Sequence, residues 1–183
     1  MAMMTKRPFV ILIAAAMLPA MAAAEVSRVE IVSRRDVLAG RAFGSAGAYE
    51  LIVSKVHFAV DPASPRNRVV VDLEKAPRNA AGLVELTADL SILKPKDQAR
   101  GNRVALIDIV NRGRRTVLTS FNRATGAGDL STEAEFGDGL LMRQGFTLLW
   151  MGWQWDVPVR PGTMRMEMPV ATENGKRITG IVR

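Results

Sequence analysis

The segment Leu83–Lys94 alternates apolar and polar residues, and this pattern constrains the fold more than any other feature of the chain. Apolar side chains occupy every even position from Val84 to Ile92. A period of two sends successive side chains to opposite faces of a strand, so one face is expected to be buried and the other to contact water. Similar patterns in Val29–Ile31, Leu51–Val60 and Val69–Leu73 predict further strands. The first half is therefore predicted to be antiparallel sheet.

Two later segments are apolar almost throughout, namely Val104–Val110 and Phe146–Met151. Such runs are typical of strands that are covered on both faces, as in parallel sheets. Between them a polar, glycine-bearing loop leads to a short helix predicted near Asp138–Gln144, which starts at Thr132 or Asp138 and ends at Gly145. The order strand, loop, helix, strand predicts a right-handed βαβ crossover.

The C-terminal region predicts a hairpin. Every second residue from Met164 to Val170 is apolar, Asn174-Gly175 favours a type I′ turn, and Ile178–Val182 forms the return strand. The methionines are expected in the core rather than in a ligand groove. Because the return strand runs directly to Arg183, we expect the chain to be part of a longer protein.

Residues 1–24 are predicted to be a signal peptide. Lys6 and Arg7 precede an apolar run from Phe9 to Leu18, and the small residues Ala22–Ala24 suit cleavage before Glu25. A membrane anchor is the alternative, but the apolar stretch is shorter than the about 20 residues of a spanning helix. We expect export by the general secretory route, with the twin-arginine route as the alternative. The product, residues 25–183, is then periplasmic or secreted and has no stable membrane anchor.

Composition narrows the classes of function. The net charge of +7 includes two cations of the predicted signal, which leaves +5 (7 − 2) on residues 25–183. The basic residues are scattered and aromatic residues make up 5%, which argues against nucleic acid as a partner. With no cysteine and one histidine, no disulfide is expected, and no metal or other cofactor.

Several motifs, taken in order, resemble the N-terminal part of the bacterial alpha/beta hydrolase domain-containing protein family. They are Phe43–Glu50, Val56–Pro62, Ala76–Gly82, Asn111–Gly113, Leu141–Phe146 and Trp150–Val157. The resemblance implies an α/β, α/β-hydrolase-like fold in which an antiparallel β-rich N-terminal part leads into a βαβ crossover of the central sheet. It also implies an incomplete domain and an ester-like small-molecule substrate.

The catalytic residues of such an enzyme are expected outside this chain. The serine nucleophile of that fold lies in a Gly-x-Ser-x-Gly turn, and Gly44–Gly47 fails the pattern because Phe43 occupies the first glycine position. The triad is therefore expected beyond Arg183, and the chain alone is expected to be inactive. His57 precedes every plausible nucleophile, so we expect it on a strand face rather than as a general base.

Two loops supply candidate site residues. Asn111, Arg112 and Gly113 follow the first apolar strand, where the family resemblance implies an oxyanion-hole donor; the alternative is an ordinary turn.

The substrate-pocket candidates follow the second apolar strand at the edge where open α/β sheets bind ligands, and they are Trp153, Gln154, Trp155 and Asp156. The alternative interpretation makes the two tryptophans core anchors and Asp156 a turn cap.

Charged residues near these loops complete the candidates. Asp108 lies within an apolar strand and is expected to form a structural hydrogen bond. The local basic cluster suits a substrate carboxylate, with a solvated loop as the alternative, and it consists of Arg112, Arg114, Arg115 and Arg123.

The function expected first is part of an exported serine-dependent esterase-type hydrolase. The alternative is a non-catalytic exported binding or structural module. A nucleic-acid-binding protein would rest on net charge alone.

Overall fold

The computed structural model describes residues 25–126 and 128–180. The predicted signal peptide, residues 1–24, lies outside this range, as does the end of the predicted return strand. Within the described residues, no helix combines the length and the apolar character needed to cross a membrane.

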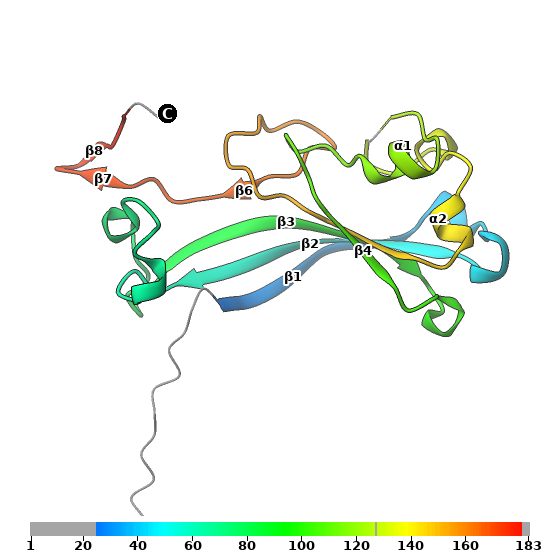
Figure 1. Ribbon diagram of the computed structural model, residues 1–183, viewed down its shortest axis with the longest axis horizontal. Helices are drawn as coiled ribbons and strands as arrows, with labels where there is room; N and C mark the ends of the chain where they lie inside the picture. Colours follow the sequence, from blue (N-terminus) through cyan, green and yellow to red (C-terminus); the bar gives the residue numbers. More distant parts are fainter. Residues whose placement is uncertain (1–24, 127, 181–183) are drawn as a thin grey trace, which may run out of the picture.

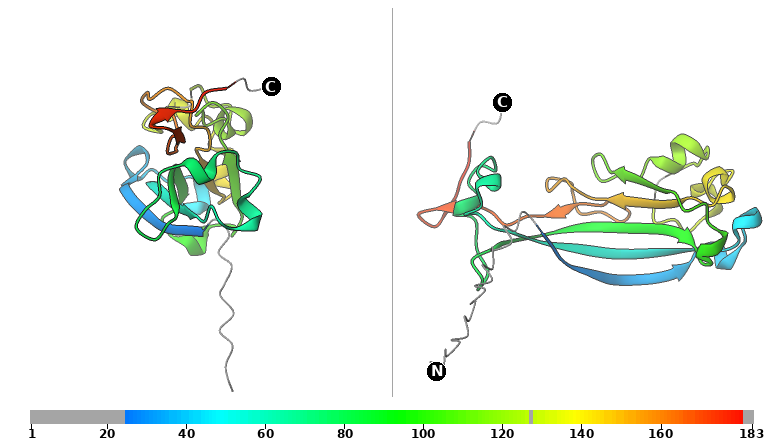
Figure 2. Two further views of the ribbon diagram at one scale, coloured as in Figure 1. Left: turned by 90° about the vertical axis from the view of Figure 1, so that its left-hand side faces the viewer. Right: turned by 60° about the horizontal axis from the view of Figure 1, so that its bottom comes forward.

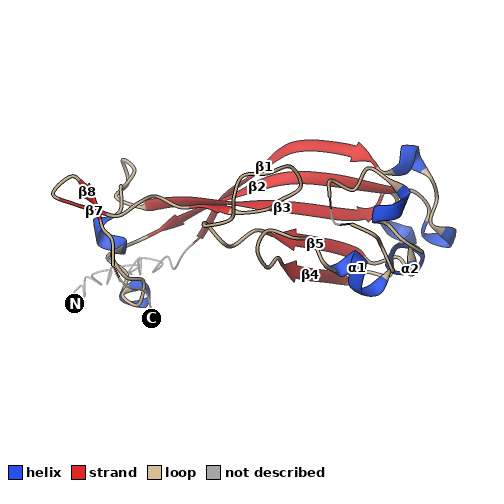
Figure 3. Ribbon diagram, turned by 90° about the horizontal axis from the view of Figure 1, so that it is seen from above, coloured by secondary structure: helices blue, strands red, loops and turns tan. Residues whose placement is uncertain are grey.

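A long, twisted mixed sheet is the frame of the molecule. Its strands run in the order β1-β2-β3-β5-β4 from edge to edge, and β6 pairs with β3 (Figures 1 and 3). All pairs are antiparallel except β4 with β5, which is parallel. The bounds are β1 Glu25–Asp36, β2 Tyr49–Val60, β3 Val84–Pro95, β4 Ala105–Ile109, β5 Thr147–Met151 and β6 Met166–Glu167. A separate hairpin consists of β7 Thr172–Glu173 and β8 Lys176–Arg177.

The alternating segments of the first half form strands as predicted, with one exception. Val69–Leu73 is a turn that leads into the 3-10 helix Leu73–Lys75, so the strand prediction there is wrong. Asp72 has a φ of 57°, which a strand does not accommodate. Val69 and Val71 are 85% and 84% exposed, so no neighbouring strand covers them.

The predicted C-terminal hairpin differs from the expectation in both of its strands. Met164–Val170 forms a strand only in β6, which pairs with β3. The described part of the predicted return strand, residues 178–180, lies outside any strand.

The predicted α/β-hydrolase-like fold is wrong for the described residues. Of the residues that the structure describes, 36% are in strands and 17% in helices, and the α-helices among them are the two short helices α1, Val117–Phe121, and α2, Leu140–Arg143. The parallel pair of β4 and β5 is present, but the chain between the two strands is mainly loop. Helix propagation is interrupted there because residues with positive φ recur, and these are Arg112, Gly113, Arg123, Gly126, Leu130, Gly137, Gly139 and Gly145.

The helix predicted near Asp138–Gln144 is present in shortened form as α2. Asp138 Oδ1 accepts a hydrogen bond from Leu140 N at 2.9 Å, and Gly145, at a φ of +80°, donates its N–H to Met142 O at 2.9 Å. The predicted end at Gly145 is thus confirmed, whereas the helix begins at Leu140 with Gly139 as its N-cap, so the predicted start at Asp138 lies one residue before the cap. Thr132 instead begins the 3-10 helix Glu133–Glu135.

The main core lies on one face of the sheet. Leu51, Leu93 and Leu148 are partners in register, and all are 1% exposed or less. Tyr49, next to this row, is fully buried. Its hydroxyl oxygen lies 3.0 Å from Met142 O and 3.0 Å from Phe146 O, so either carbonyl can accept its hydrogen bond. Both α-helices lie on this side of the sheet (Figures 1 and 2). The loops between β4 and β5 are therefore fixed to the sheet by a buried aromatic residue.

The opposite face of the sheet is open along its two edge strands, β1 and β4, whereas its central side chains are buried, with Ser54 2% and Leu90 8% exposed. One row crosses all five strands in register, and its members are Ile31, Ser54, Leu90, Met151 and Ile109. At the two edges of this face Ile31 is 61% exposed and Ile109 53%, and Ile107 in the same strand as Ile109 is 63% exposed. The expectation that β4 is covered on both faces is therefore wrong, since β4 is an edge strand with one bare face.

One buried carboxylate lies at the end of this open face. Glu50 is 4% exposed, and Arg34 donates to it from Nε at 2.5 Å and from Nη2 at 2.7 Å. Lys94 Nζ lies 2.7 Å from its Oε1. The hydrogen bonds from Arg34, followed by those from Lys94, lower the pKa of Glu50 from its ordinary value of 4.5 to about 2.

Replacing Glu50 should therefore change the acid stability of the fold. Because the folded-state pKa is depressed, the stabilisation is fully present above pH 4.5 and is lost as pH falls from 4.5 through about 2. Urea unfolding of Glu50→Gln should show lower stability at pH 7 and a flatter pH profile in this window. Glu74→Gln, at an exposed position, is the control and should keep the profile of the wild type. Identical profiles for Glu50→Gln and the wild type would contradict the ion-pair assignment.

Candidate functional site

The first candidate loop is a tight turn directly after β4. Arg112 and Gly113 have φ values of 51° and 76°, and Arg114 N donates to Asn111 O at 3.2 Å. Two successive residues with positive φ are typical of a type I′ turn. The turn is also packed from outside, because a Cβ on Gly113 would lie 2.7 Å from Val157 Cγ1.

Arg112 joins the two sets of predicted site residues. Its backbone N–H donates to Gln154 Oε1 at 2.5 Å, and its Nη1 donates to Asp156 Oδ2 at 2.7 Å. The hydrogen bond from Arg112 lowers the pKa of Asp156. Of the three predicted oxyanion-hole residues, Arg112 thus has its N–H occupied by a side chain of the second loop. The arrangement is a clamp between the loops that follow β4 and β5.

The two tryptophans of the second loop are not core anchors. Trp153 is 50% exposed and Trp155 is 54% exposed, whereas Trp150 in β5 is fully buried. The core interpretation of Trp153 and Trp155 is therefore wrong, and the core indole is one that the sequence analysis did not single out. The position of Trp150 within the apolar strand β5 could have identified it as a core residue, because it is in register with Ser91 on the covered face.

The backbone beside Trp155 is held at several points while its indole remains exposed. Trp155 O accepts a hydrogen bond from Arg165 Nη2 at 3.0 Å, and Gln154 O accepts one from Met166 N at 3.0 Å. Arg112 holds the side chains on either side of Trp155. The indole is therefore presented on a fixed backbone.

Trp155 lines an apolar surface groove of about 240 Å³. Its other apolar walls come from Val71, Met168, Pro169, Val170 and Ile178, and the charged residues Asp72 and Arg177 also line it. The groove is thus lined by one of the seven predicted loop residues, Trp155.

The alternating apolar residues of Met164–Val170 lie partly in the core and partly in this groove. Met164 is buried as predicted, at 2% exposure, but Met168 and Val170 are each 45% exposed. The core prediction is wrong for these two residues. Sequence reasoning missed Val71 and Met168 as groove residues because their proximity to Trp155 arises from the tertiary fold.

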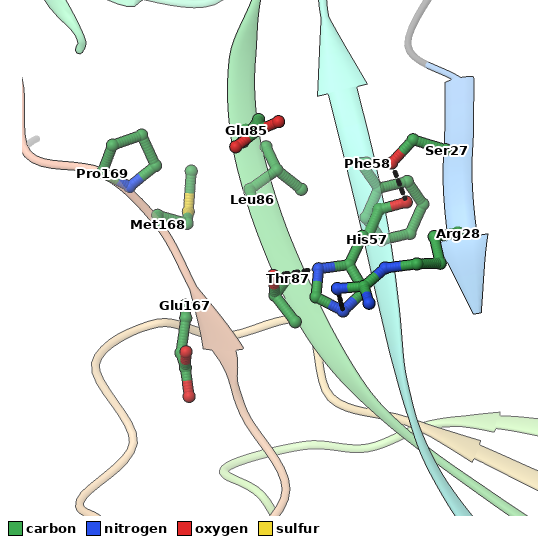
Figure 4. A pocket seen from close by; sticks show the side chains of 10 residues that line it. All are labelled: Ser27, Arg28, His57, Phe58, Glu85, Leu86, Thr87, Glu167, Met168 and Pro169. Atoms are coloured by element: carbon green, nitrogen blue, oxygen red, sulfur yellow. Dashed lines mark hydrogen bonds between the residues drawn. The ribbon is translucent and has the colours of Figure 1, made fainter. Parts of the chain in front are cut away.

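His57 lies on the sheet face opposite Val56, as predicted. Its Nδ1 is 3.2 Å from Thr87 Oγ1, and its Nε2 is 3.0 Å from Arg28 Nη2 (Figure 4). Nε2 is also 3.0 Å from Glu30 Oε2. These contacts join β1, β2 and β3 beside a cavity of about 360 Å³. Each ring nitrogen is engaged by a sheet neighbour, which fits the structural role expected for His57.

The remaining charged candidates differ in their surroundings. Asp108 Oδ2 accepts a hydrogen bond from Thr116 N at 3.3 Å, in line with its predicted structural role. Arg112, Arg114 and Arg123 are exposed, but Arg115 is buried, so the solvated-loop interpretation is wrong for that residue.

Comparison with known proteins adds no relative: no family model, no curated protein and no solved structure matches the chain. The resemblance to the alpha/beta hydrolase domain-containing family therefore stays a prediction, and function is argued below from the geometry.

Because the turn after β4 is tightly packed, Gly113→Ala should strongly lower the free energy of unfolding. The added Cβ would be strained at a φ of +76° and would overlap Val157 Cγ1 and Met164 O, the latter at 2.9 Å. Gly175→Ala is the matched control, because Gly175 has a φ of +74° and open space around it. We expect chemical denaturation to show a loss of about 1 kcal/mol for Gly175→Ala. Gly113→Ala should lose about 1–3 kcal/mol more. Equal losses would show that the turn is not packed as described.

Proposed function

We propose that this chain is a non-catalytic binding module that holds a small apolar group, acyl or aromatic, against Trp155. The observation that carries the proposal is a half-exposed indole on a backbone that hydrogen bonds hold in place. An indole buries a large apolar area when it is covered, and a fixed backbone lowers the entropy lost on binding.

The groove beside Trp155 sets the kind of ligand. Its walls are mainly apolar, which suits an acyl chain or an aromatic ring, and Asp72 and Arg177 supply polar groups that orient a ligand. A volume of about 240 Å³ is below the roughly 300 Å³ at which pockets for drug-sized ligands begin. The ligand expected here is therefore a small molecule or one end of a larger molecule.

Esterase activity, implied by the family resemblance, stays a separate prediction. The N–H of Arg112, one of three expected oxyanion-hole residues, is already bonded to Gln154 Oε1. The geometry thus favours binding over catalysis for these loops. Export of the chain also stays a prediction, since residues 1–24 lie outside the described range.

Benzyl acetate is a suitable probe, because it carries an aromatic ring and an ester bond in one small molecule. Saturation-transfer NMR should detect its ring on the wild type, and Trp155→Ala should weaken binding about tenfold or more. Trp153→Ala is the matched control, since Trp153 is equally exposed but does not line the groove. Its affinity should equal that of the wild type.

The same spectra test for catalysis, because hydrolysis would release benzyl alcohol. We expect none above the protein-free blank. Equal losses of binding in both tryptophan variants, or no binding to the wild type, would contradict the proposed groove. If the wild type formed benzyl alcohol and Trp155→Ala did not, the chain would be an enzyme rather than a non-catalytic binding module.

A further inference from the structure

Arg115 is a buried cation with no carboxylate partner among the described residues. It is 8% exposed, yet no acidic oxygen lies within 4.0 Å of its guanidinium in that part of the chain. Exposed Arg112, from the same loop, has Asp156 as a partner at 2.7 Å. A buried charge is costly unless it is paired, so the lack of a counter-ion at Arg115 calls for a physical reason.

The groups that contact the guanidinium are all neutral. Nη1 donates to Gly128 O at 2.7 Å and to Gly162 O at 3.4 Å, and Nη2 donates to Ser91 Oγ at 3.0 Å. The guanidinium carbon lies 6.0 Å from the centroid of the Trp150 ring. Three of the five N–H bonds are used, and buried Nε has no hydrogen-bond partner in the described structure.

The nearest carboxylates are engaged elsewhere. Asp89 Oδ1 lies 3.3 Å from Lys55 Nζ. Glu135 and Asp129 both accept hydrogen bonds from Ser131, each at 2.9 Å. Burial lowers the pKa of the guanidinium even though these three carboxylates oppose the shift. The long-range attraction of these carboxylates is thus smaller than the desolvation cost of burying the Arg115 cation.

Two cavities adjoin this cation, and they differ in charge. One, of about 310 Å³, is also lined by Asp89 and Asp129. The other, of about 350 Å³, is lined by two arginines, three threonines, glycine and proline, and by no acidic residue. Its polar walls are Arg114, Arg115, Thr116, Thr119 and Thr163. Only the second cavity combines cations and hydroxyl groups without a competing carboxylate.

We propose that this second cavity, named here the Arg115 cavity, binds a small molecule through a carboxylate or phosphate group. Arg115 provides the buried positive charge and Arg114 provides a second cation at the wall. The hydroxyls of Thr119 and Thr163 already donate to backbone carbonyls, so Thr116 is the threonine whose hydroxyl can donate to a ligand oxygen. An oxyanion in this cavity supplies the counter-charge that Arg115 lacks. The site shares no lining residue with the Trp155 groove, so it is independent of the function proposed above.

The direct test is NMR of the arginine Nε–H signals of the whole chain during titration with sodium phosphate or sodium acetate. Sodium chloride at the same ionic strength is the control. We expect a saturable shift of the Arg115 signal with at least one of the two oxyanions and none with chloride. A response to phosphate alone or to acetate alone identifies the class of ligand. No response to either, or the same response to chloride, would overturn the proposal.

Variants distinguish binding in the Arg115 cavity from a general attraction of anions to the positive charge of the protein. Arg115→Lys keeps the charge but loses the planar donor fork, so affinity should fall about tenfold or more. Arg114→Gln should also weaken binding, and it serves as the second variant if Arg115→Lys does not fold. Arg123→Gln changes the net charge equally outside the cavity and should bind as the wild type does. Equal weakening by Arg114→Gln and Arg123→Gln would overturn the assignment to this cavity.

Discussion

Burial of one face of the sheet is the interaction on which the rest of the structure depends. Leu51, Leu93 and Leu148 form one row across β2, β3 and β5, and Trp150 lies beside it. Burial of each large apolar side chain contributes about 1.5–3 kcal/mol, so this face supplies much of the drive to fold. The Tyr49 hydroxyl then fixes the segment around α2 to the sheet through two backbone carbonyls. On the other face the side chains of the central strands, such as Val56 and Ala88, are also buried, but the edge residues Ile31 and Ile109 are exposed.

Both candidate sites include residues of the loops that follow β4 and β5, and the covered face holds these two strands in place. Because these strands are parallel, the loops that follow them leave from the same edge of the sheet. Arg112 on one loop holds the other loop from the solvent side, where Trp155 is exposed. Arg115, three residues further, turns inward over Trp150 and is buried. The two loops thus present an aromatic side chain outward and a cation inward.

The sequence predicted the features that depend on local geometry. Alternation in Leu83–Lys94 located β3, and Asn174-Gly175 forms the turn between β7 and β8 with φ values of 51° and 74°. It failed where distant segments decide the outcome. An apolar strand such as β4 has the same residue pattern whether one or both faces are covered, so the exposure of Ile107 and Ile109 could not be read from it. The exposure of Trp155 and the burial of Arg115 likewise depend on residues far along the chain.

The central claim, a sheet with one packed face and an opposite face that is open along its edge strands β1 and β4, is tested most directly by methyl NMR with a soluble gadolinium chelate that broadens exposed groups. The account predicts strong broadening of the methyl signals of Ile31, Ile107 and Ile109, and little change for Leu51, Leu93 and Leu148. Equal protection of both sets would contradict it, because the open face would then be covered.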